Sequence, residues 1–212
     1  MTIVFRLVIL ALLVLLALLG HGHQLVRRLK GEAAAAGVGG RTGHASVYLW
    51  FLCYGALFVL AAGRMLLGAA PGVLAAVGML LMAAGVALRR LALAQIGECF
   101  DEFILVKKDH RVVDRGVYRL CRHPLHKGLL LELTGMALVN AQLIAWVLVG
   151  LAAALFFVRG VAEERTLAAA LGAPYREYLA RVPSLVDLVP RAWRPYAPER
   201  AAAPPDGPEP RP

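Results

Sequence analysis

Long apolar runs separated by short charged stretches dominate this chain. Three of these runs, each interpreted as one membrane-crossing helix, cover residues 2–20, 46–66 and 73–88. The third run ends at Arg89-Arg90, where we expect the helix to leave the membrane. A longer apolar stretch, residues 128–158, is interpreted as a helical hairpin that turns near Asn140. Its first arm is short and carries Glu132, which indicates a helix that is tilted or partly buried in protein. The pattern predicts an all-α, polytopic membrane helical bundle of about five transmembrane helices.

The remaining segments complete the predicted organisation. Leucines and tyrosines recur at spacings of three and four within residues 163–181, which predicts an amphipathic helix or helix pair at the surface. Residues 69–72 predict a tight turn. The end of the chain is rich in Pro, Ala and Glu and is expected to be disordered. We therefore divide the chain into N-terminal membrane helices, a core and a disordered tail, at residues 1–66, 67–197 and 198–212.

Composition and charge support a membrane protein. The 212 residues are 59% hydrophobic, with a mean hydropathy of +0.65 and a net charge of +9. Residues 65–88 hold no charged side chain, whereas residues 89–127 hold nine Lys and Arg. This asymmetry predicts that the basic segments face the cytoplasm and the N-terminus lies outside. Membrane lipids are thus expected neighbours, and no nucleic-acid motif is present. Arg6 followed by an apolar core also resembles a signal peptide, but the run ends without a clear cleavage site, so we expect a retained helix.

A cationic cluster, Arg122 to Gly128, stands at the start of the predicted hairpin and is the first candidate for chemistry. Pro124 suits the first position of a helix, which places His123 near the N-cap. The free N–H groups and the positive end of the helix dipole then point to the same place as Arg122, which suits a carboxylate or phosphate. The simpler interpretation is a basic membrane-surface loop with a helix-starting proline.

A second polar cluster follows the hairpin. Arg159 and Glu163 are four residues apart, so they share one helix face. The simpler interpretation of Arg159 is a boundary charge that reaches toward the membrane surface. The pattern Cys121-x-His123-x-x-His126 could suggest a metal, but spacing places no fourth ligand beside it. We therefore expect no bound metal.

An ordered set of motifs resembles the isoprenylcysteine carboxyl methyltransferase family. The motifs are His110-Arg-Val-Val113, Gly116-Val-Tyr118, Arg122-His-Pro-Leu-His-x-Gly128, Arg159-x-x-x-Glu163-Glu164 and Leu171-Gly172-x-x-Tyr175-x-x-Tyr178-x-x-Arg181-Val-Pro183. The resemblance covers about residues 89–190. Arg-His-Pro also occurs in membrane sterol reductases, so the ordered set rather than one motif is specific. The resemblance implies membrane helices, a cytoplasmic-side pocket for S-adenosylmethionine, and methylation of lipophilic small-molecule or lipidated acceptors. Residues 67–197 would then be the methyltransferase core.

The resemblance also implies roles for individual residues. Those that would lie along the cofactor, largely through their backbone, are His110, Arg111, Val112 and Val113. Tyr118 would pack on the cofactor, and Glu163 would bind its polar groups, including the ammonium. The wall around its methionyl end would be formed by His123, Pro124, Leu125 and His126. Arg159 would face and orient the acceptor carboxylate.

Two positions depart from the family's usual pattern. His126 stands where the family usually has Tyr, and Leu125 stands where a small residue such as Ser is frequent. Two other functions stay open. One is an NADPH-dependent membrane reductase of the sterol-reductase type, which would share Arg-His-Pro, and the other is a non-catalytic membrane protein on the same scaffold, which the departure at His126 favours. The sequence leaves the methyl acceptor open among a prenylated peptide, a small lipophilic acid, a thiol and a phospholipid amine. It also leaves the oligomeric state open.

Overall fold

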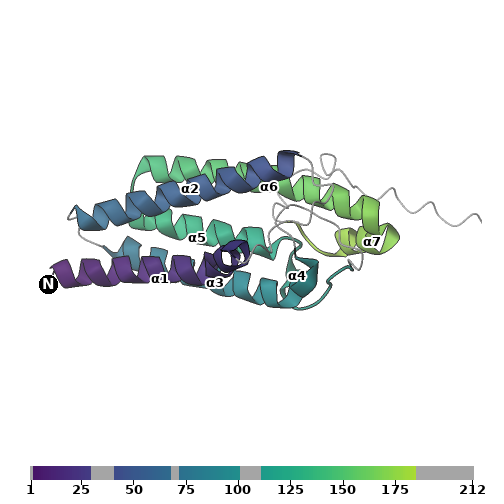
Figure 1. The fold of residues 1–212 in the computed structure, drawn as a ribbon, viewed down its shortest axis with the longest axis horizontal. Helices are drawn as coiled ribbons and strands as arrows, with labels where there is room; N and C mark the ends of the chain where they lie inside the picture. Colours follow the sequence, from purple (N-terminus) through teal and green to yellow (C-terminus); the bar gives the residue numbers. More distant parts are fainter. Residues whose placement is uncertain (1, 30–40, 68–71, 101–110, 185–212) are drawn as a thin grey trace, which may run out of the picture.

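The described part of the chain is a bundle of helices that run lengthwise beside one another (Figure 1). The computed structural model describes residues 2–29, 41–67, 72–100 and 111–184. Its α-helices are α1 (Thr2–Leu29), α2 (Arg41–Leu66), α3 (Val73–Ile96), α4 (Val117–Leu120), α5 (Pro124–Asn140), α6 (Leu143–Leu171) and α7 (Ala173–Arg181), with a short 3₁₀ turn, η1 (Gly97–Cys99), after α3. The predicted all-α architecture is confirmed.

Three helices in the described residues are long and apolar enough to cross a membrane. They are Tyr48–Leu66 within α2, Val73–Ile96 and Leu143–Leu171. The apolar part of α1 is shorter, at Arg6–Leu19, and α5 has 17 residues. Large apolar side chains are exposed along α1, α2, α3 and α6, as expected for helices that face lipid. The count of five spans stays a prediction.

The predicted hairpin between α5 and α6 is confirmed. α5 ends at Asn140, Ala141 takes a left-handed conformation with φ 49°, and α6 begins at Leu143. The Asn140 amide donates hydrogen bonds to the carbonyl oxygens of Leu57 (3.1 Å) and Met136 (2.9 Å). The turn is thereby fastened to α2, so the short arm α5 is buried between other helices.

The helix of the third predicted span is longer than the sequence indicated. The helix does not stop at Arg89-Arg90 but continues to Ile96, and Arg89 is 2% exposed. The physical reason is a partner that hydropathy does not show: Arg89 forms an ion pair with Glu132 of α5. Because its charge is paired, Arg89 can lie within α3 and be buried between helices, and it does not have to lie in a loop at the membrane surface.

The predicted helix pair over residues 163–181 is present, although its first half is the end of the long helix α6. Gly172, with φ 65°, separates α6 from α7. Tyr175, Tyr178 and Leu179 of α7 pack with Ala168 and Val182 in a second apolar cluster, apart from the main core of the bundle. The predicted turn at 69–72, apart from Gly72, and the predicted disordered tail 198–212 lie outside the described residues.

Candidate functional site

The site is built where α4, the start of α5, the end of α6 and α7 gather, at the opposite end of the bundle from the N-terminus (Figure 1). The segment after α7 holds the segment before α5 in place. The Tyr178 hydroxyl donates to the carbonyl of Tyr118 (2.8 Å), and the Arg122 amide donates to the carbonyl of Pro183 (3.1 Å). Arg181 also pairs with Asp114 at 2.8 Å. The Tyr-x-x-Arg-Val-Pro motif therefore fixes the position of residues 114–122 through these contacts.

A second fastening joins this segment to the end of α3. The side-chain carbonyl of Gln95 accepts a hydrogen bond from the Val117 amide at 2.8 Å, and Arg115 donates to the Gln95 backbone carbonyl at 3.0 Å. Gly116 has φ 54°, and a Cβ there would collide with the Gln95 side chain. The Gly-Val-Tyr118 motif therefore begins with glycine for steric reasons. Gln95 was not anticipated from the sequence.

The start of α5 is as predicted. His123 is the N-cap residue and Pro124 opens the helix. The His123 side chain does not cap its own helix but turns toward α6, where its Nε2 lies 2.9 Å from Oε1 of Glu164. An ionised carboxylate only accepts hydrogen bonds, so Nε2 carries the proton in this contact. The imidazole rests against the α6 backbone, since a Cβ on Gly160 would lie 3.4 Å from Nε2.

Glu164 is the most firmly held carboxylate of the site, and it was not among the residues predicted from the sequence. Its second oxygen lies 3.0 Å from Nη1 of Arg122, and the two side chains are only 8% and 7% exposed. Spacing from Arg159 favoured Glu163 instead. A different signal was available: Phe156, Gly160 and Glu164 are four residues apart and form one buried stripe along α6.

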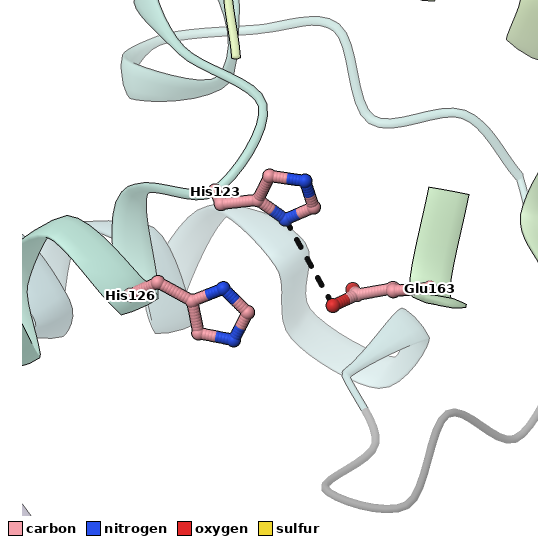
Figure 2. Close-up of side chains that lie close together, drawn as sticks. All are labelled: His123, His126 and Glu163. Atoms are coloured by element: carbon pink, nitrogen blue, oxygen red, sulfur yellow. Dashed lines mark ion pairs between the residues drawn. The ribbon is translucent and has the colours of Figure 1, made fainter. Parts of the chain in front are cut away.

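Glu163 is the partly open carboxylate of the pair. Its side chain is 30% exposed, and Oε2 lies 3.8 Å from His123 Nδ1, too far for a hydrogen bond. In Figure 2 its carboxylate, His123 and His126 turn toward one another from α5 and α6. Burial, followed by the negative charge of Glu163, raises the pKa of both Tyr118 and Tyr175, which keeps these phenols protonated near neutral pH.

His126 is buried between two flat side chains. Its ring is nearly parallel to those of His123 and Phe156, with centroid distances of 5.3 and 5.1 Å. Its Nδ1 is buried and, like the Tyr118 hydroxyl, has no hydrogen-bond partner among the described residues. Buried polar atoms without partners are uncommon, and both mark places where a polar ligand group would be accommodated. Arg159, 9% exposed, lies on α6 one turn before Glu163.

The same side chains form a group that could hold a metal ion. One ligand atom each of His123, His126 and Glu163 lie within 4.8 Å of one another, a juxtaposition that sequence spacing did not place. The 2.9 Å contact of His123 Nε2 with Glu164 does not exclude a metal, because histidine ligands commonly donate their other ring N–H to a carboxylate. Against a resident metal stands the positive charge of the Arg122 guanidinium, which pairs with the same Glu164. The expectation of no metal stays a prediction.

The other predicted residues lie around this centre in different ways. Pro124 is fully buried, and Leu125 and Val113 are partly buried. Val112 packs its side chain into the cluster around Tyr175 and Tyr178, and Arg111 is exposed. His110 lies outside the described residues. The structure thus brings Tyr118, His123, His126, Glu163 and Arg159 into one region of the fold.

An open apolar groove lies on another part of the bundle. It has a volume of about 540 Å³ and is lined by Phe51, Leu52, Gly55, Ala56, Val59, Leu60, Ile144 and Leu148. The groove offers contact for a hydrocarbon chain but no titratable group. Any chemistry therefore belongs to the polar cluster at the other end of α6.

Comparison with known proteins agrees with these motifs. Residues 76–169 match the family model of the isoprenylcysteine carboxyl methyltransferase family. Schizosaccharomyces pombe protein-S-isoprenylcysteine O-methyltransferase is 31% identical over 106 residues, which cover 49% of this chain and 45% of that protein. Arabidopsis thaliana protein-S-isoprenylcysteine O-methyltransferase B is 30% identical over 115 residues, 53% of this chain and 58% of that protein. The Rattus norvegicus enzyme of the same name is 32% identical over 114 residues, 52% of this chain and 40% of that protein.

These matches confirm the resemblance inferred from the ordered motifs. The family model covers the stretch that carries Tyr118, His123, His126, Arg159 and Glu163, and it ends before α7. The matched segments amount to about half the length of the curated relatives.

Proposed function

We propose that this chain is an integral membrane methyltransferase that moves a methyl group from S-adenosylmethionine to a lipophilic acceptor, with an isoprenylcysteine-like carboxylate as the favoured acceptor. The observation that carries this proposal is the partly open carboxylate of Glu163 beside His123 and His126, with the unpartnered Nδ1 of His126 and the unpartnered Tyr118 hydroxyl in the same region of the fold. The similarity to isoprenylcysteine methyltransferases supports it.

The residues present suit the cofactor's chemical groups. S-adenosylmethionine, when bound, supplies a methyl group on a positively charged sulfur. Glu163 would hold its ammonium, because an opposite charge in a mostly dry site is strongly favoured. The flat ring of Tyr118 would pack against it, and the unpartnered polar atoms of Tyr118 and His126 would gain hydrogen bonds. Backbone atoms of residues 110–113 would lie along it, and the wall would consist of His123, Pro124, Leu125 and His126.

Arg159 would orient the acceptor. Its guanidinium is planar and matches both oxygens of a carboxylate. A carboxylate acceptor is already a nucleophile, so no residue has to remove a proton. The protein instead holds both reactants in line and keeps water out, and the burial of His123, His126 and Arg159 serves that purpose.

The membrane explains how two unlike reactants would meet. The polar donor would enter from the cytoplasm, past Glu163, while an apolar acceptor would approach from the bilayer between helices. We therefore place the site at the cytoplasmic face, with the N-terminus outside and the basic segment 89–127 inside. The charge asymmetry of the chain supports this orientation.

The deciding experiment is a binding and turnover assay on detergent-purified full chain. S-adenosylmethionine and NADPH are titrated separately, followed by transfer of labelled methyl to an N-acylated S-prenylcysteine. The control acceptor carries a carboxamide in place of the free carboxylate. We expect binding of S-adenosylmethionine in the micromolar range and transfer only to the free acid. Binding of NADPH instead would indicate the reductase, and binding of neither would indicate a non-catalytic protein.

A further inference from the structure

Helices α3 and α5 make the most extensive helix–helix contact of the described bundle, and their backbones touch. The contact occurs at two levels, Gly78 against Gly135 and Gly85 against Gly128. A Cβ on Gly85 would lie 2.5 Å from the carbonyl oxygen of Gly128, and a Cβ on Gly78 would collide with the carbonyl oxygen of Gly135. The glycines thus permit an approach that any larger residue would prevent.

This glycine contact does not by itself set the register of the two helices. The glycines recur every seven residues on both helices, so a slide of seven residues, about 10 Å, would place Gly85 against Gly135 and the small Ala92 against Gly128. In lipid, apolar side chains gain little from one register over another, because hydrocarbon surrounds them in either case. A second feature must therefore select the native register.

A buried polar cluster stands at the level of Gly85 and Gly128. Nη1 of Arg89 lies 3.0 Å from Oε1 and 3.3 Å from Oε2 of Glu132, and these side chains are 3% and 0% exposed. Tyr54 of α2 donates its hydroxyl to the same carboxylate at 3.3 Å. Arg89 passes directly over Gly128, since a Cβ there would collide with its Cγ. The cluster therefore joins α2, α3 and α5 at one height.

From this arrangement we infer that the Arg89–Glu132 pair is a positioning device, which selects the register of α3 against α5 and so places His123 and His126 in the site. A slide of seven residues would bring Val139 opposite Arg89 and Ile96 opposite Glu132. Each buried charge would then lose the opposite charge that it faces in the native register, which is strongly unfavourable. The apolar interface tolerates more than one register, and the ion pair removes the alternatives.

The effect reaches the site through α5 itself. His126 lies six residues before Glu132, about 120° around the same helix, on the side that packs against Phe156 of α6. A rotation or slide of α5 therefore moves His126 along α6 and shifts His123 relative to Glu164. Displacements of about 1 Å in a catalytic site can lower rates by about 100-fold.

The test replaces the pair by uncharged residues of similar size, in the full-length protein. In R89M/E132M no buried charge is left unpaired, so the variant should fold. Spin labels on exposed Ala87 and Ala141, in a background without native cysteines, report the α3–α5 distance. We expect one distance in the parent protein, and a broadened or second distance in R89M/E132M.

If the proposed methyl transfer holds, kcat/KM of R89M/E132M should fall about 100-fold. The control variant R90M, at the exposed neighbouring arginine, should match the parent protein.

The kinetic measurement rests on the proposed function, whereas the distance measurement does not, so the failure of the inference and the failure of the proposed function can be told apart. Unchanged kinetic constants in a folded R89M/E132M would overturn the inference. Should the parent protein transfer no methyl group, the proposed function fails, and the distance measurement alone decides: a parent-like distribution in the double variant overturns the inference. If R89M/E132M does not fold, E132D carries the test, because it keeps both charges but retracts the carboxylate by one methylene. A parent-like distance and parent-like turnover in E132D would then overturn the inference.

Discussion

The imidazole Nε2 of His123 lies 2.9 Å from Oε1 of Glu164, and this contact joins the N-cap residue of α5 to the C-terminal part of the buried face of α6. The other oxygen of Glu164 takes the Arg122 guanidinium at 3.0 Å. Both oxygens are thus engaged within the protein, whereas neighbouring Glu163 is 30% exposed. The two adjacent glutamates therefore have different tasks: Glu164 holds the site together, and Glu163 is left to meet a ligand.

Replacement of Glu164 should cost stability. Glu164→Ala leaves the buried Arg122 guanidinium without its carboxylate, and breaking a buried pair in this way costs about 3–5 kcal/mol. Thermal unfolding in detergent should show a clear loss, and Glu177→Ala, an exposed glutamate on α7, serves as the control. Equal unfolding temperatures for the two variants would mean that the Arg122–Glu164 pair contributes no net stability.

Replacement of Glu163 should weaken cofactor binding with little effect on stability. Glu163→Ala removes the charge proposed to face the ammonium, and we expect the Kd for S-adenosylmethionine to rise at least about tenfold, equivalent to about 1.4 kcal/mol. Isothermal titration on detergent-purified protein measures this, with Glu163→Asp as the conservative partner that should recover part of the affinity. Unchanged affinity in the alanine variant would remove Glu163 from the site.

The fold was predicted from the sequence where hydropathy and turn residues decide it. The α5–α6 hairpin turns at the predicted Asn140-Ala141-Gln142, and Pro124 opens α5 behind the His123 cap. Hydropathy did not predict the length of α3. A charged residue such as Arg89 ends an apolar run in the sequence, but the helix continues past it because Arg89 is paired with Glu132 of a neighbouring helix. The pattern of apolar and charged residues along the sequence does not show which buried charges pair with each other in the fold.

The site was predicted in part for a similar reason. The ordered motifs predicted Tyr118, His123, His126 and Glu163 as site residues, and the structure places these residues in one region of the fold. The choice of Glu163 over Glu164 relied on spacing from Arg159, which shows which residues share a face but not which face is buried. Gln95 has no motif, and its role follows only from the hydrogen bond to Val117 across 22 positions of sequence.

The proposed orientation can be tested by cysteine labelling of intact cells. A membrane-impermeant maleimide should modify a cysteine placed at exposed Ala141 and should spare native Cys99. Cys121 is a poor reporter, because burial raises the pKa of its thiol and thus lowers the reactive thiolate fraction from either side. In permeabilised cells its labelling should accordingly be slow near neutral pH and faster as pH rises. Outside labelling of Cys99 in intact cells would overturn the orientation.

The last prediction separates cofactor binding from acceptor orientation at Arg159. This residue is 9% exposed and lies one turn before Glu163, toward the apolar part of α6, so an acceptor in the bilayer should meet it first. Arg159→Lys keeps the positive charge but loses the planar fork that matches a carboxylate. We expect unchanged affinity for S-adenosylmethionine and a loss of most methyl transfer to a carboxylate acceptor, measured by titration and by labelled-methyl turnover on the same preparation. Loss of cofactor binding with preserved turnover at saturating cofactor would instead place Arg159 in the cofactor pocket. If neither quantity changes, Arg159 is a boundary charge, and the acceptor carboxylate is held by another residue.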